Sequence, residues 1–244
     1  MPYKIRKNNY YYEVIKYYKK EQKLDFKTKE KTERNVRLEK TMRAKNKIID
    51  LALNNHFTHF ITITIDKSKH NRYDYETIKK KLTKQFNHYQ QRKDPTFYYI
   101  IKAELHKDKA IHFHGLIHTT NLTQLKYNSY QSKKDSIRLD RKIDTYDWLP
   151  FKEKFGWTHA TKIYNAQEFI AYYMSKYISK SDDHILAHRY FRSKGLKISD
   201  EFTLDELPLI PDTAPTFNNR FVTKWKTDSK EYYEITQKFK KMGY

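Results

Sequence analysis

Two stretches decide the fold: FTHFITITID at residues 57–66 and TFYYIIKAELHKDKAIHFHGLIH at residues 96–118. The first is rich in β-branched residues, and its isoleucines alternate with threonines, which predicts a strand. The second contains two runs of strand-forming residues, 96–105 and 111–118, joined by the polar segment HKDKA. A short polar connection between two such runs predicts a β-hairpin.

Helical patterns surround these strands. Apolar residues recur at helical spacing over 41–55 and 74–93, which predicts two helices. WTHATKIY at 157–164 predicts a further strand, and a helix should follow over 165–180, starting at a capping box formed by Asn165 and Glu168. Strands and helices in this mixture indicate an α+β fold.

Three regions follow from the same patterns. Residues 1–40 alternate tyrosine and lysine without a clear period and are expected to be a basic N-terminal extension. Residues 41–200 should form the main domain, in which the polar stretch 121–147 is expected to be largely loop or an insertion. Residues 201–244 should be a C-terminal linker, marked by three prolines between 207 and 219, and a final basic helix.

The charge of the chain indicates a polyanionic partner. Fifty Lys and Arg against 29 Asp and Glu give a formal charge of +21, and 22 Tyr and 14 Phe are interleaved with the lysines. Exposed rings can stack on unpaired bases while lysines neutralise phosphates, which favours single-stranded nucleic acid. The alternative is that an A+T-rich coding sequence enriches Lys, Asn and Tyr and that most rings are core.

Several classes of protein are disfavoured. The chain has no cysteine, so neither disulfides nor a thiolate metal site can contribute to the fold. No apolar run approaches the length of a membrane span, and the N-terminus lacks the apolar segment of a signal peptide. We expect a cytoplasmic protein without a membrane partner.

The hairpin carries a candidate metal site. His112 and His114 project to the same face of a strand, and the turn brings Glu104 across from them. Two imidazoles and one carboxylate suit a divalent ion, Mg or Mn, with open coordination positions. His106 and His118 are competing ligands that rank below Glu104, and the alternative is that the strand histidines are structural.

The helix over 165–180 carries a candidate nucleophile. Ala166, Ile170, Met174, Tyr177 and Ile178 form its apolar stripe at ~100° per residue. Tyr173 lies at the edge of this stripe, and Lys176 follows one turn later. A phenol there could contact both the sheet and a bound strand. The alternative is that a tyrosine-rich amphipathic helix is simply packed on the sheet.

Taken together, FITITID, ELHKDKAIHFHGLIH and YYMSKYISK resemble, in order and spacing, the three motifs of the HUH endonuclease superfamily, and within it the rolling-circle replication initiator (Rep) proteins of plasmid and phage type. SKGLK at 193–197 and RAKNKIIDLALNN at 43–55 also resemble that branch. The resemblance covers about residues 41–198, which makes 41–200 the expected HUH nuclease domain. It implies a ferredoxin-like palm: a central antiparallel sheet with flanking helices.

The resemblance also implies a reaction. Glu104, His112 and His114 would hold the metal, Tyr173 would attack DNA and Lys176 would assist. Such enzymes nick single-stranded or hairpin origin DNA, form a 5′-phosphotyrosine and leave a 3′-hydroxyl for a polymerase. Tyr177 fits the second nucleophile of some phage initiators, although the helical pattern buries it.

Two departures from the family pattern narrow the prediction. The chain lacks the phosphate-binding motif G-x-x-x-x-G-K-[ST], so a separate helicase is expected, in addition to the separate polymerase that the resemblance implies. The turn of the metal motif has Asp108 and Lys109 where relatives have a glycine, and an aspartate can adopt the left-handed conformation of such a turn. The alternatives are an HUH relaxase or single-strand transposase, a non-catalytic single-strand-binding protein and a hydrolase of small phosphates.

Overall fold

The computed structural model describes residues 3–18, 33–106, 108–164, 167–179, 190–207, 211, 213–218 and 222–243. The chain divides into two compact units. One unit is Glu33–Leu196, and the other combines Met1–Thr32 with Lys197–Tyr244. The fold is α+β: the described residues form six helices and two antiparallel sheets, one sheet of seven strands and one of five.

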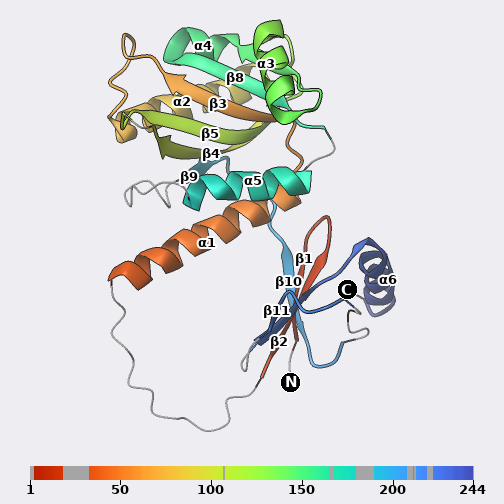
Figure 1. Ribbon diagram of the computed structural model, residues 1–244. Coiled ribbons are helices and arrows are strands. Elements are labelled where there is room, and N and C mark those ends of the chain that lie inside the picture. Colours follow the sequence, from red (N-terminus) through yellow and green to blue (C-terminus); the bar gives the residue numbers. More distant parts are fainter. Residues whose placement is uncertain are drawn as a thin grey trace. The chain divides into compact units, whose positions relative to one another are not determined.

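The unit Glu33–Leu196 is built on the seven-stranded sheet, whose strand order is β6-β7-β8-β3-β5-β4-β9 (Figure 1). Every neighbouring pair is antiparallel. The hairpin β4–β5 and the strand β3 lie in the inner part of the sheet. The strands are β3 (His59–Ile65), β4 (Tyr98–Leu105), β5 (Ile111–His118), β6 (Leu125–Tyr127), β7 (Thr145–Trp148), β8 (Gly156–Lys162) and β9 (Tyr190–Arg192).

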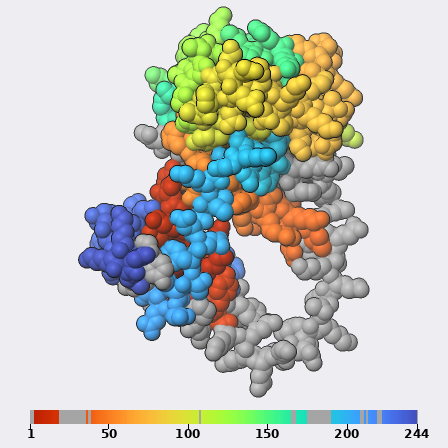
Figure 2. All heavy atoms as spheres, turned by 180° about the vertical axis from the view of Figure 1, so that it is seen from behind, coloured from red at the N-terminus to blue at the C-terminus, as the bar shows by residue number. Residues whose placement is uncertain are grey.

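One face of this sheet packs on the main hydrophobic core. α2 (Tyr75–Arg92) covers it, and α4 (Leu149–Phe155) adds Phe151 and Phe155. Seen from behind, the yellow atoms of α2 form the outer surface of this unit (Figure 2). Strand alternation puts every second residue of β3, β4 and β5 into this core: Ile61, Ile63, Ile65, Tyr99, Ile101, Ala103, Ile111, Phe113 and Ile117.

The opposite face carries two other helices. α5 (Gln167–Ser179) contacts β4 and β5, and α1 (Glu33–Asn54) packs along α5 (Figure 1). The residues of β3 that point to this side, Phe60, Thr62 and Thr64, alternate with the core isoleucines. None of the helices in the described part of the chain has both the length and the apolar composition to cross a membrane.

The strands and helices expected around the metal motif are confirmed. β3, β4, β5 and β8 occupy the predicted segments, and α1, α2 and α5 match the predicted helices, although α1 begins eight residues earlier than the expected 41. Asp74 caps α2 by accepting a hydrogen bond from the Thr77 amide. The proposed cap of α5, Asn165, lies outside the described residues.

The prediction for residues 121–147 is wrong. This stretch contains β6, β7 and the helix α3 (Ser129–Leu139). Asn128 caps α3 through the Gln131 amide. The stretch is therefore an integral edge of the sheet rather than a loop insertion.

The second unit joins both ends of the chain in one five-stranded sheet, ordered β10-β1-β2-β12-β11. Its helix α6 (Ser229–Lys241) starts with a capping box of Asp228 and Glu231 and packs Ile235 and Phe239 on Ile5 and Val14 of the sheet. The strands are β1 (Tyr3–Lys7), β2 (Tyr12–Tyr17), β10 (Asp200–Leu204), β11 (Phe217–Asn218) and β12 (Val222–Lys226).

This sheet changes the interpretation of both ends. Residues 3–17 were expected to belong to a basic extension, but β1 pairs with β10, and β2 pairs with β12. The C-terminal segment likewise contributes three strands before the predicted helix. Alternating Tyr and Lys hid the strands, because Tyr12 is buried in the core whereas Tyr17 of the same strand is 46% exposed.

Candidate functional site

The hairpin β4–β5 sets the geometry of the candidate site. Its register places Glu104 directly across from His112 and Lys102 across from His114. Phe113, between the histidines, is fully buried in the core on the other face. Glu104, His112 and His114 therefore project from the face that α5 covers.

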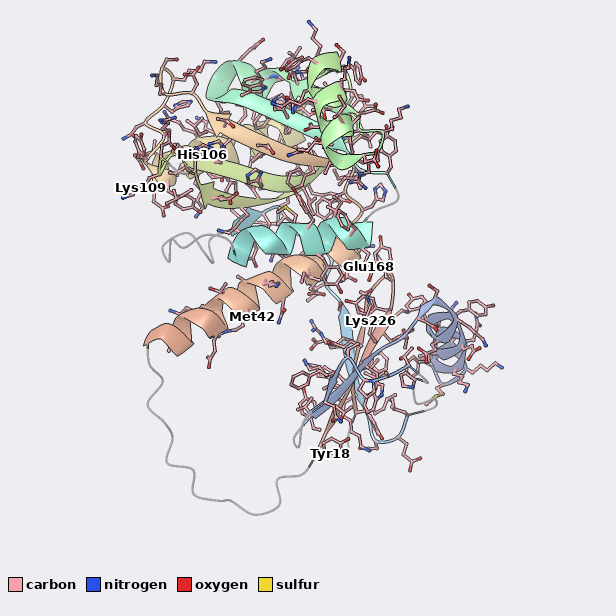
Figure 3. All side chains as sticks on the ribbon, viewed as in Figure 1. Tyr18, Met42, His106, Lys109, Glu168 and Lys226 are labelled. Atoms are coloured by element: carbon pink, nitrogen blue, oxygen red, sulfur yellow. The ribbon has the colours of Figure 1, made fainter. Side chains whose placement is uncertain are left out.

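The turn of the hairpin lies beside this site, between His106 and Lys109 (Figure 3). The Lys109 amide donates to the His106 carbonyl, and Lys109 has φ +62°. Lys109, rather than Asp108, adopts the left-handed conformation. Asp108 instead stabilises the turn by accepting hydrogen bonds from the Ala110 amide and the Arg72 guanidinium.

Two threonines of β3 hold the histidine rings. Thr62 Oγ1 lies 3.1 Å from His114 Nδ1, and Thr64 Oγ1 lies 3.2 Å from His112 Nδ1. When each Nδ1–H donates to its threonine, the lone pair of Nε2 is available to a metal. Burial lowers the pKa of His112, and the nearby His106 and His114 act in the same direction. The His112 imidazole is thus neutral at pH 7, as a metal ligand must be.

Glu104 reaches one of the two histidines directly. Its Oε2 lies 3.1 Å from Nε2 of His114, and both side chains are largely shielded from solvent. Within the described ranges, no three His, Asp or Glu side chains converge as a preformed metal site. The donor set still fits a divalent ion, since a cation could replace the direct contact between carboxylate and imidazole after small side-chain rotations.

The competing histidines occupy different positions. The His106 ring stacks on that of His112 with centroids 4.7 Å apart, and it is largely exposed beside Asp108. The His118 ring stacks on that of Tyr98 with centroids 4.7 Å apart. His118 lies four residues after His114 on β5. His106 is therefore at the rim of the site, while His118 belongs to an aromatic cluster at the far end of β5.

α5 brings Tyr173 to the same side of the sheet as the histidines. The Tyr173 ring packs edge-on against Phe60 at 5.5 Å, and Phe60 stacks on His114 at 6.0 Å. On the same helix Ala171 and Met174 are buried and Tyr172 is exposed. Lys176 and Tyr177 lie on the backbone of α5, but their side chains fall outside the described residues.

A cavity of about 630 Å³ connects these groups. His114 and Thr62 line it from the sheet, and Tyr173 lines it from α5. Its volume is in the range of pockets that hold a small organic ligand. The structure thus brings Tyr173 and His114 to one space, with Glu104 in contact with His114.

Residues 58–182 match the family model of the Replication-associated protein ORF2/G2P. The chain belongs to this family. The match confirms the resemblance drawn from the motifs, and it spans the segment from β3 through α5 that builds the cavity. Searches of curated proteins and of solved structures found no significant match.

Sequence reasoning missed a polar row across the sheet of this ORF2/G2P family protein. Five side chains lie at matching register positions on five adjacent strands of the face that carries His114. Lys102, at one end, is fully buried and donates to the Ala103 carbonyl. The row consists of Asp147, His159, Thr62, His114 and Lys102.

The other end of the row is a histidine beside a carboxylate. His159 lines the cavity, and its Nδ1 lies 3.5 Å from Asp147 Oδ1. Asp147 also accepts from Lys152 Nζ at 2.6 Å and from Asn128 Nδ2 at 3.0 Å. The motif T-H-A-T at 158–161 contains this histidine, but only the pairing of β3 with both β5 and β8 relates it to His114.

Proposed function

We propose that this replication-associated protein initiates rolling-circle replication by nicking and rejoining single-stranded DNA at an origin. The observation that carries the proposal is the contact chain from Tyr173 through Phe60 to His114 at one cavity. A nucleophilic phenol and a metal-binding carboxylate–imidazole set beside one space are the components of transesterification at phosphorus. Membership of the family supports the role in replication.

In the proposed reaction the Tyr173 oxygen attacks the scissile phosphorus. The phenol loses its proton, an oxygen–phosphorus bond forms, and the bond from phosphorus to the 3′ oxygen breaks. The 3′ oxygen takes up a proton, which leaves a 3′-hydroxyl and a 5′-phosphotyrosine. A separate polymerase could extend that hydroxyl, and reversal of the same step would rejoin a strand.

Each residue of the site has a role in this step. Glu104, His112 and His114 would hold a divalent ion, Mg or Mn, which polarises the phosphate when bound. Thr62 and Thr64 orient the imidazoles. Phe60 packs against the Tyr173 ring and limits its rotation. Lys176, one helical turn after Tyr173, is the proposed source of positive charge near the leaving group.

The test is covalent capture of DNA. Labelled single-stranded oligonucleotides tiled across the DNA element that encodes the protein are incubated with the chain and Mn²⁺, and a denaturing gel detects an adduct. We expect one group of oligonucleotides to give an adduct that EDTA prevents and that Tyr173→Phe abolishes.

Matched variants make the result specific. Tyr172→Phe changes the exposed neighbour of Tyr173 on the same helix and should leave the adduct intact. Tyr177→Phe reports whether a second tyrosine takes part. An adduct that persists in Tyr173→Phe would reject this nucleophile, and binding without any adduct would identify a non-catalytic single-strand-binding protein.

A further inference from the structure

Part of the cavity wall is not used by the proposed chemistry. It consists of the segment after α3, the end of β8 and the first turn of α5, and it contributes Arg141, Lys162, Tyr164 and Phe169. Phe169 is 54% exposed and Tyr164 is 45% exposed. Large rings that stay open to solvent at a cavity need a reason, because burial would stabilise the fold more.

Each ring has a cation above it. The Arg141 guanidinium carbon lies 5.8 Å from the centre of the Phe169 ring, and Lys162 Nζ lies 5.0 Å from the centre of the Tyr164 ring. Phe169 also stacks on Tyr173 with centroids 6.1 Å apart and planes 19° apart. One aromatic–cation pair is therefore directly adjacent to the proposed nucleophile.

The carboxylates near this wall are already engaged. Asp135 accepts from Arg138 Nη2 at 3.0 Å, and Asp144 accepts a hydrogen bond from the Tyr164 hydroxyl. The hydrogen bond to Asp144, together with burial, raises the pKa of Tyr164 to about 12. Because its hydroxyl is engaged by Asp144 and its pKa is raised, Tyr164 suits a platform rather than a second nucleophile.

We propose that Phe169 and Tyr164 stack two unpaired bases of the DNA strand beside the phosphate that Tyr173 attacks, while Arg141 and Lys162 bind its backbone. This inference rests on the proposed function and names how its substrate is held. A base can replace the cation over each ring, since stacking on an aromatic side chain needs no particular base. The long arginine and lysine side chains can then swing from ring to phosphate. Only an unpaired strand offers a free base face.

The experiment separates the base contribution from the backbone contribution. Fluorescence anisotropy measures binding of an oligothymidylate ten nucleotides long and of an abasic oligonucleotide of the same length. Both titrations contain EDTA, so that the DNA is not cut. Wild-type protein should bind oligothymidylate more tightly than the abasic oligonucleotide. The ratio of the abasic Kd to the oligothymidylate Kd measures the contribution of base stacking. Phe169→Ala should weaken oligothymidylate binding by about 5- to 100-fold and change abasic binding by less than about twofold.

Three further variants complete the test. Phe169→Trp should preserve the ratio, because indole offers a larger ring face. Arg141→Gln should weaken both oligonucleotides equally and reduce the salt slope by about 0.7. Phe217→Ala is the matched control, since Phe217 is 49% exposed and has Lys224 Nζ 6.0 Å from its centroid, but it belongs to the other unit and should not change the ratio.

Failure of the stacking proposal and failure of the proposed nicking reaction give different results. Equal losses for both oligonucleotides in Phe169→Ala, or no loss, would overturn the stacking role, and so would the same effect in Phe217→Ala. Absence of a covalent adduct in wild-type protein would instead reject the nicking reaction while leaving a stacking result intact. Circular dichroism of Phe169→Ala checks that the loss does not come from unfolding.

Discussion

The Thr62 hydroxyl lies 3.1 Å from Nδ1 of His114, although the two residues are on different strands and 52 positions apart. The pairing of β3 with β5 places them face to face. A partner at Nδ1 restrains the orientation of the ring, so Nε2 is directed toward Glu104, which it contacts at 3.1 Å. The threonines of β3 are thus part of the proposed metal site.

Thr62→Val should therefore weaken metal binding without unfolding the sheet. Loss of such a partner typically reduces metal affinity by about 10- to 100-fold. We expect the Mn²⁺ concentration for half-maximal adduct formation to rise by about 10-fold, with maximal adduct at saturating metal nearly restored. Thr62→Ser keeps the hydroxyl and should behave like wild type. Equal metal requirements in the valine and serine variants would show that the hydroxyl has no orienting role.

Gly115 limits which side chains β5 can carry at its pairing with β4. A Cβ there would lie 2.4 Å from Ile101 Cδ1 and 2.5 Å from the Ile100 carbonyl oxygen of the neighbouring strand. The backbone oxygen cannot move without breaking the pairing of β4 with β5. Gly115→Ala should cost about 3 kcal/mol of unfolding free energy, measured by urea denaturation.

Gly195→Ala is the control for this prediction. It has φ +75° but no atom within 4 Å of the added Cβ, so only the backbone conformation resists the change, at about 1 kcal/mol. A smaller loss at Gly115 than at Gly195 would mean that the sheet relaxes around the new methyl group.

The hairpin and the shared face of His112 and His114 could be predicted because both depend on local alternation in the sequence. The residues that contact these histidines from other strands could not be predicted. Thr62 and His159 reach the site only through pairing of β3 with β5 and β8, and no local pattern specifies which distant strands pair.

The missed helix α3 has a different explanation. Its buried residues are the polar Ser132 and Asp135, whereas Ile137 is 73% exposed. Its apolar residues therefore do not mark its buried face, and periodicity fails as a signal. The paired chain ends were missed because β2 and β12 are about 200 residues apart in sequence: the Tyr12 amide donates to Thr227, 215 positions away.

Asp94 should make the unit Glu33–Leu196 sensitive to acid. Burial acts to raise its pKa, but hydrogen bonds from Thr96, Thr119, Thr120 and Asn121 outweigh that effect and lower the pKa to about 2. In the unfolded chain an aspartate has a pKa of about 3.9. A carboxyl group whose pKa is lower in the folded state stabilises the fold at pH values above about 3.9, and this stabilisation is lost as the pH falls toward 2.

Asp94→Asn should lower the unfolding free energy by about 2 kcal/mol at pH 7. The difference from wild type should shrink between pH 4 and pH 2, because wild-type Asp94 becomes protonated there. Urea denaturation at pH 7, 4 and 2.5 measures it. A difference that stays constant over this range would show that the hydrogen bonds from these four residues do not stabilise the carboxylate charge.

The five-stranded sheet predicts a distinctive result for truncation at the N-terminus. β1 and β2 are its central strands, between β10 and β12. Removing residues 1–18 therefore takes away the β1 partner of β10 and the β2 partner of β12. It also removes Ile5, Tyr12 and Val14 from the core on which α6 packs. We expect the C-terminal segment to become as sensitive to protease as an unfolded chain, although no residue in it is changed.

The same truncation should spare the unit Glu33–Leu196, which contains all the proposed site residues: Glu104, His112, His114 and Tyr173. Limited proteolysis should yield a resistant fragment close to these bounds, and the fragment should still form the tyrosine adduct. As a control, Ile235→Asp disrupts the core of the same small unit from α6, where Ile235 is 1% exposed, and should expose the same cleavage sites. Resistance of the C-terminal segment after the N-terminal deletion would mean that β10 and β12 find stable partners without β1 and β2.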